Sequence, residues 1–278
     1  MKKYLVGALV LAFAGAGCLG GEDSNPLTPG DVDDPAFEAF TAEFDAIDEG
    51  TGFMVESMFE IVDGIFNSAP GTPPTVASEF QYSLEWDAAA GHWVASVSGS
   101  DVESGTAFSL SHTVQFIQDG DAVQYPDPEL VDRISSSTEM DLSGEGINSA
   151  GGTQDMVIDV EQLETDVLLT LNGSGTANLD VTHVETTETG STTCDVALNF
   201  TATVSDIQIW GSDTGEEGGC PLGGDISYQG SSSIVCSGEG GEVNVSGNWG
   251  VTQTFSESGI ATRVTHGDNF WTTEESCF

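Results

Sequence analysis

The feature that most constrains this chain is the one-by-one alternation of apolar and polar residues that begins near residue 80 and recurs toward the C-terminus. It is clearest over residues 80–86 and 108–116, where every second side chain is apolar or aromatic. Successive side chains of a β-strand point to opposite faces, so each such segment has one apolar face and one polar face. This pattern is typical of antiparallel sheets with one solvated side, and it excludes a parallel βαβ architecture.

Two later segments interrupt the alternation. Residues 172–175 read Asn-Gly-Ser-Gly, and we predict a hairpin turn there between strands at residues 167–171 and 176–184. Over residues 194–210 the apolar positions change parity, and we predict a β-bulge near Ser205 and Asp206 that returns the later apolar residues to the same face. The whole pattern indicates about ten to twelve antiparallel strands.

Two amphipathic helices are predicted before the strands. Asp34 and Pro35 are suited to start the first helix, and the second begins near Phe53. Each helix has large apolar side chains at helical spacing on one side and acidic residues on the other. The apolar positions are Phe37, Phe40, Phe44, Ile47, Met54, Val55, Met58, Ile61, Val62 and Ile65. We interpret both apolar faces as packing surfaces rather than as part of a cofactor site.

These patterns together predict a mainly β protein of the α+β class. A large antiparallel β-sheet, arranged as a sandwich or a half-barrel, occupies residues 78–278, and a helical pair over residues 35–67 packs on it. The apolar faces of the strands must cover each other or be covered by the helices, because neither element is stable with its apolar side in water.

The N-terminus has the order of residues of a signal peptide. Lys2 and Lys3 precede an apolar run over residues 4–14, and small residues follow before Cys18. The run has about 11 residues, short of the roughly 20 that span a bilayer, so we expect it to be cleaved. A cysteine after small residues resembles the lipobox of bacterial lipoproteins, although Gly15 stands where that family usually has a larger apolar residue.

The resemblance implies that residues 1–17 are removed and that Cys18 carries a lipid which holds the protein on a membrane. Gly20 is not the aspartate that in this family tends to retain a lipoprotein at the inner membrane, so the resemblance favours the outer membrane. Residues 18–34 are rich in Gly, Pro, Asp and Ser and are expected to form a flexible tether. The alternative is ordinary signal cleavage nearby, which would leave Cys18 as a thiol.

The chain is strongly acidic because bases are scarce. It has 46 Asp and Glu against 4 Lys and Arg, and removal of Lys2 and Lys3 changes the net charge from −42 to −44. Such a surface repels nucleic-acid phosphates and anionic headgroups, so we expect no nucleic-acid partner. Self-repulsion between carboxylates is screened at high salt, and we therefore predict a marine or otherwise salt-adapted source.

Four cysteines besides Cys18 are expected to form two disulfides. They are Cys194, Cys220, Cys236 and Cys277, an even number in a chain with an export signal. Their spacing contains no closely spaced pair of the kind that zinc sites use, so we predict no metal here. Three pairings are possible, and the sequence does not choose among them.

No catalytic motif stands out, and we predict neither an enzyme nor a cofactor. By strand parity His112, His183 and His266 fall on apolar faces, but nothing in the sequence brings them together. A G-x-S-x-G nucleophile elbow and an H-E-x-x-H zinc motif are both absent from the sequence. Acidic clusters such as residues 31–34, 119–121 and 213–217 do not match a calcium-binding loop, and we interpret them as solvated turns.

We therefore expect an envelope lipoprotein that contacts the membrane through its lipid and has a non-catalytic structural or binding domain. Its location would be the outer membrane, facing either the periplasm or the outside. The alternative is a carrier or sensor of apolar ligands, in which a curved sheet leaves a cavity capped by the helices. That layout is similar in outline to the half-barrel lipid and lipoprotein carriers of the periplasm, a likeness of fold alone.

Overall fold

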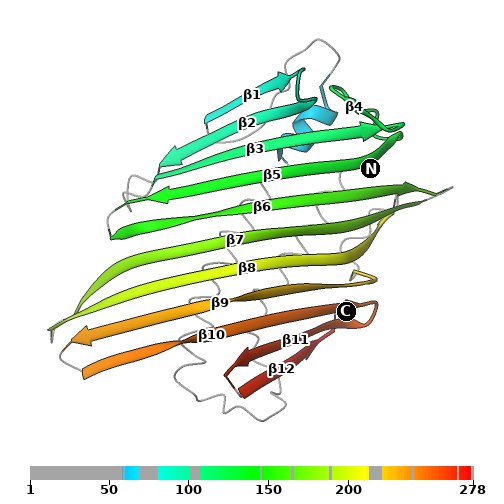
Figure 1. Ribbon diagram of the computed structural model, residues 1–278. Coiled ribbons are helices and arrows are strands. Elements are labelled where there is room, and N and C mark those ends of the chain that lie inside the picture. The colour runs from blue at the N-terminus through cyan, green and yellow to red at the C-terminus, as the bar shows by residue number, and fades with distance from the viewer. Residues whose placement is uncertain are drawn as a thin grey trace.

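The strands form one continuous antiparallel sheet (Figure 1). The structure is a computed structural model, and it describes residues 58, 60–68, 81–100, 107–144, 146–163, 166–187, 190–212, 221–238, 241–267 and 269–276. Within these residues the sheet has twelve strands: β4 pairs with β3, and the other eleven lie side by side in the order β1-β2-β3-β5-β6-β7-β8-β9-β10-β11-β12. The large antiparallel sheet predicted from the alternation is confirmed.

All neighbouring strands pair antiparallel, and the longest strands lie in the middle of the sheet. The bounds are β1 Gln81–Asp87, β2 His92–Ser100, β3 Ala107–Gln118, β4 Asp121–Val123, β5 Val131–Ser143, β6 Ile147–Gln162, β7 Asp166–Thr187, β8 Gly190–Ser212, β9 Gly223–Gly238, β10 Gly241–Ser256, β11 Gly259–His266 and β12 Asn269–Glu275.

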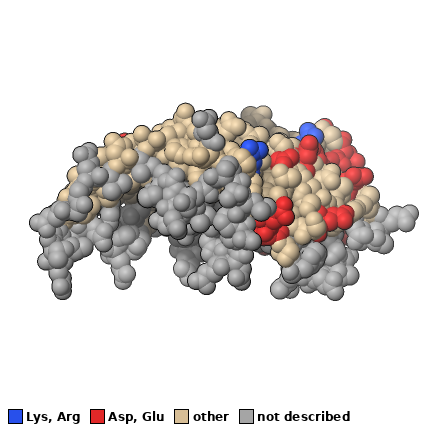
Figure 2. Space-filling view, turned by 90° about the horizontal axis from the view of Figure 1, so that it is seen from below, with Lys and Arg blue, Asp and Glu red and all other residues tan. Residues whose placement is uncertain are grey.

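The alternation gives the sheet two unlike faces. We call the face that carries the buried apolar side chains the inner face, and the opposite one the outer face. Inner-face residues from strands far apart in the sheet are at most 1% exposed, among them Phe116, Ile158, Ile207 and Val251. The outer face carries mainly Ser, Thr, Asn, Gln and acidic side chains. Viewed along its edge, the described part of the molecule forms an arch (Figure 2).

A helix over residues 60–66 packs on the inner face near β2 and β3 (Figure 1). Its residues Ile61, Val62 and Ile65 are at most 1% exposed, as the predicted apolar face requires. Phe66 meets Phe116 of β3 edge to face, with ring centroids 5.2 Å apart. Apolar burial on this scale is the main stabilising term of the contact. The helix predicted before residue 53 lies outside the described residues.

The hairpin predicted at residues 172–175 is wrong, because these residues continue a single long strand, β7. The glycines have another reason to be there. A Cβ on Gly173 would stand 2.6 Å from the carbonyl oxygen of Asp155, and one on Gly175 would stand 2.7 Å from that of Thr153. Glycine inside a strand often marks a close approach of a neighbouring backbone, and β6 makes that approach here.

The bulge predicted in β8 is confirmed. The pairing with β7 and with β9 shifts around Ser205 and Asp206, and Asp206 has a φ of 50°. Val204 and Ile207, on either side of the bulge, are both buried. The extra residue therefore returns the apolar side chains after the bulge to the inner face, as the parity change in the sequence requires.

Candidate functional site

The structure pairs two of the predicted disulfide cysteines. Cys194 of β8 lies opposite Cys236 of β9 in register, and the two form a disulfide. Cys220 and Cys277 lie outside the described residues, as does the predicted lipidation site Cys18.

The three histidines predicted on apolar faces do not meet. His112, His183 and His266 lie on β3, β7 and β11, which are separated by three and then four strand spacings in the sheet order, or about 14 Å and 19 Å. His266 stacks on Trp249 with ring centroids 3.9 Å apart. A joint metal or catalytic site made of these three residues is therefore excluded by the topology.

His112 is a fully buried side chain that is satisfied within the sheet. Its Nδ1 lies 2.8 Å from Oγ1 of Thr138, the residue opposite it on β5. Burial lowers the pKa of His112 from the ordinary value of 6.5 to about 4, so the ring is neutral at pH 7. The pair thus serves as a polar element of the core.

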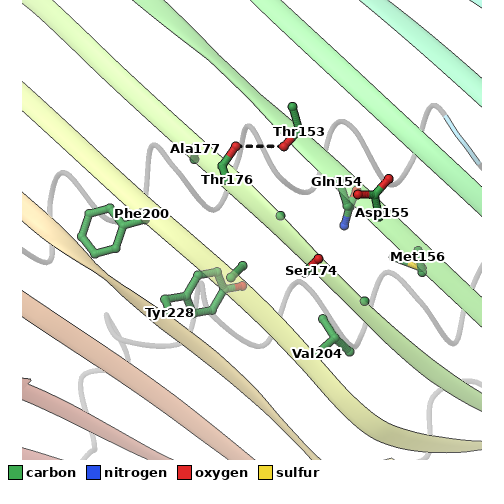
Figure 3. Close-up of a pocket in the computed structure, with 13 residues that line it drawn as sticks. Thr153, Gln154, Asp155, Met156, Ser174, Thr176, Ala177, Phe200, Val204 and Tyr228 are labelled. Carbon is green, nitrogen blue, oxygen red and sulfur yellow. Dashed lines mark hydrogen bonds between the residues drawn. The ribbon is translucent and has the colours of Figure 1, made fainter.

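A hollow interrupts the inner face between β6 and β9 (Figure 3). The small residues Gly175 and Ala202 line it, together with the larger side chains of Gln154, Phe200 and Tyr228. The cavity volume is about 20 Å³, which is space for one water molecule. At this point the inner face is a packed core and not a ligand cavity.

A much larger concavity, which we call the outer trough, lies on the outer face over β3, β5, β6 and β7. Its volume is about 510 Å³, within the range of small-molecule sites. Two rows of cross-strand neighbours form it, spaced two residues apart along the strands. The first row is Thr113, Ser137, Asp155 and Ser174, and the second is Gln115, Ser135, Val157 and Asn172.

The trough is hollow because small side chains occupy its middle. Ser135 and Ser137 of β5 lie between longer side chains of β3 and β6, and His92 of β2 also lines the trough. Four adjacent strands give the trough a length of about three strand spacings, or about 14 Å. The lining therefore offers hydroxyl, amide, carboxylate and imidazole groups within one ligand-sized area.

The β1–β2 turn fixes one wall of the outer trough. The carboxylate of Asp87 accepts hydrogen bonds from the backbone N–H groups of Ala90 and Ala89, and these hold the pKa of Asp87 below its ordinary value. The turn ends at Gly91, which has a φ of 71°. The Gln115 side-chain amide then donates to the Gly91 carbonyl oxygen at 3.1 Å, which orients Gln115 along the wall.

The β8 bulge fixes the opposite wall. The Oδ1 atom of Asn172 accepts a hydrogen bond from the backbone N–H of Asp206 at 2.9 Å. The Nδ2 group of Asn172 also donates to Oδ1 of Asp206 at 3.2 Å. Both amide side chains of the second row are therefore held by the backbone architecture before any ligand arrives.

Within the described residues, no group of three or more potential metal ligands comes together. Asp119 and Gly120 form the tight β3–β4 turn, with φ values of 54° and 83°. The other two acidic clusters noted in the sequence lie outside the described residues. No helix among the described residues has the length and apolarity to cross a membrane.

Comparison with known proteins gives no functional assignment: no protein-family model, curated protein or solved structure matches this chain. The two faces of the sheet are therefore the features that bear on function. The outer trough has no signal in the sequence, because its residues are ordinary serine, threonine and amide positions until the strand register brings them together.

Proposed function

We propose that this protein is a membrane-anchored envelope lipoprotein whose folded domain is a non-catalytic binding domain that acts through its outer face. The proposal combines the lipobox-like sequence at Cys18 with the shape of the described sheet. The signal-like order of the first residues and the expected tether support a location outside the cytoplasm and close to a membrane. Because the lipid only anchors the protein, the folded domain would supply the surface that binds a ligand.

The observation that carries the binding assignment is the difference between the two faces. The hollow that described residues of β6, β7, β8 and β9 line on the inner face has a volume of about 20 Å³, whereas the trough on the described part of the outer face has a volume of about 510 Å³. A hollow with space for one water molecule does not accommodate an acyl chain. The geometry therefore favours a binding domain over the carrier of apolar ligands that the sequence left as the alternative.

The anchor is tested by the intact mass of protein extracted from membranes, compared with a Cys18→Ser variant. The expected mature chain begins at an acylated Cys18, and the variant is expected to lose the lipid and leave the membrane fraction. An unlipidated chain cut at another position would contradict the anchor.

The binding assignment is tested with the lipid-free domain and washed fragments of cell envelope. Ser137 lies in the middle of the trough, and Ser231 is exposed on the same face of β9, away from it. We expect the wild-type domain and Ser231→Tyr to be retained on the fragments, and Ser137→Tyr to be washed off. Equal retention of both variants would contradict binding through the outer trough.

A further inference from the structure

We propose that the outer trough binds an uncharged glycan, with the carboxylate of Asp155 and the hydroxyls of its first row as the main hydrogen-bonding groups. This inference rests on the proposed function, because it names the ligand class of the same site. It follows from the chemistry of the lining, from its unused hydrogen-bonding capacity and from its charge.

The lining matches the chemistry of sugar hydroxyls. Each hydroxyl of a glycan can donate one hydrogen bond and accept others, so it needs partners of both kinds. Asp155 supplies acceptors, the amides supply both kinds, and the serine and threonine hydroxyls rotate to supply either. An apolar ligand would leave these groups desolvated and unbonded, which costs free energy at each one.

The first row of the trough has hydrogen-bonding capacity that the protein does not use. Elsewhere on the outer face polar side chains bond across strands, as in Thr153 to Thr176 at 2.9 Å and Thr182 to Asp195 at 2.8 Å. Among the described residues, the side chains of the first row, Thr113, Ser137, Asp155 and Ser174, make no such side-chain bond. Groups without a protein partner on a concave surface are available to a ligand.

The charge of the trough favours an uncharged ligand. Its lining holds one carboxylate, Asp155, and one imidazole, His92, at separate places. It contains no lysine or arginine that could bind a sulfate, phosphate or uronate group, and the acidic surface repels such anions. One carboxylate among neutral groups can instead accept charge-assisted hydrogen bonds from sugar hydroxyls.

A protein partner fits the trough less well. Protein interfaces usually have a core of aromatic and aliphatic side chains surrounded by a polar rim. The only aliphatic side chain in the two rows is that of Val157, and neither row contains an aromatic residue. A polar, elongated ligand that lies across the strands uses the trough more completely.

The test is a glycan array that carries neutral, acidic and amine-bearing oligosaccharides, probed with the lipid-free domain. We expect neutral oligosaccharides to bind the wild type and Ser231→Tyr, and to lose binding to Ser137→Tyr. Asp155→Asn keeps the shape of the side chain but removes its charge, and we expect it to bind about tenfold more weakly, as for one lost charge-assisted hydrogen bond. Circular dichroism melts verify that each variant folds.

Binding restricted to acidic or to amine-bearing oligosaccharides would overturn the assignment to uncharged glycans. Absence of all glycan binding would overturn it too. If the domain is still retained on envelope fragments and Ser137→Tyr is not, the proposed function stands and only the ligand class is wrong. If neither glycans nor envelope fragments bind, both proposals fail.

Discussion

Buried His112 should make the stability of this domain fall steeply in mildly acidic solution. Its pKa is about 4 in the folded chain against 6.5 in an ordinary environment, so the unfolded chain binds the proton more strongly. The stabilising contribution is therefore complete above pH 6.5 and is lost as the pH falls toward 4. At about 1.4 kcal/mol per pKa unit, the full loss is about 3 kcal/mol, and most of it is reached by pH 4.5.

The measurement is urea unfolding at pH 7.5 and pH 4.5, followed by tryptophan fluorescence, for the wild type and for His112→Gln. Glutamine can still bond to Thr138 but does not titrate. Both proteins are studied in 0.5 M NaCl, because screening reduces the effect of protonating the many carboxylates. We expect the wild type to lose about 2–3 kcal/mol more than His112→Gln between the two pH values.

Two results would refute this reasoning. Equal losses for the wild type and His112→Gln would mean that His112 does not control the acid response. An NMR titration that gives His112 a midpoint near 6.5 would show that its burial is not maintained in solution.

Four further outcomes are expected. Replacing both Cys194 and Cys236 by serine should cost about 4 kcal/mol in the free energy of unfolding, since the bridge closes a loop with a sequence separation of 42; denaturant unfolding measures it, and an unchanged midpoint would contradict it. Peptide mapping without reduction should find Cys220 linked to Cys277, because the first residues of β9 and the last residues of β12 lie at the same end of the strands. Two free thiols would contradict this pairing. Ile65→Ala should cost about 2–5 kcal/mol, measured the same way, because the side chain is 1% exposed. The melting temperature should be higher in 1 M than in 20 mM NaCl, and equal values would remove the case for salt adaptation.

The sequence predicted the sheet well, because alternation depends only on local spacing. The two faces, the β8 bulge and the apolar side of the helix at Ile61 and Ile65 all follow from which positions must be buried. The hairpin in β7 was mispredicted because the segment that contains Gly173 and Gly175 has the composition of a turn. Their actual role depends on how closely the β6 backbone approaches β7, and the local sequence does not show that distance.

The outer trough could not be predicted from the sequence for a similar reason. Thr113 and Ser174 belong to one row of cross-strand neighbours although 61 positions separate them. The row exists only once three registers are fixed, and a shift of one residue in any of them would turn part of the row to the inner face. Inner-face positions such as Ser136 and Thr138 also weaken the alternation in β5, which conceals that strand in the sequence.

The order of the strands has a consequence for how the chain can be assembled. Apart from β4, which pairs only with β3, each strand lies beside the strands that precede and follow it along the chain, so no pairing has to wait for a distant segment. Closing short loops costs less entropy than closing long ones, and such a sheet can grow by one strand at a time from either end. A chain that emerges N-terminus first can therefore order β1, β2 and β3 while β12 is still unfolded. Shortening the protein from its C-terminus would likewise remove strands singly, and each cut would expose one new edge instead of opening the middle of the sheet.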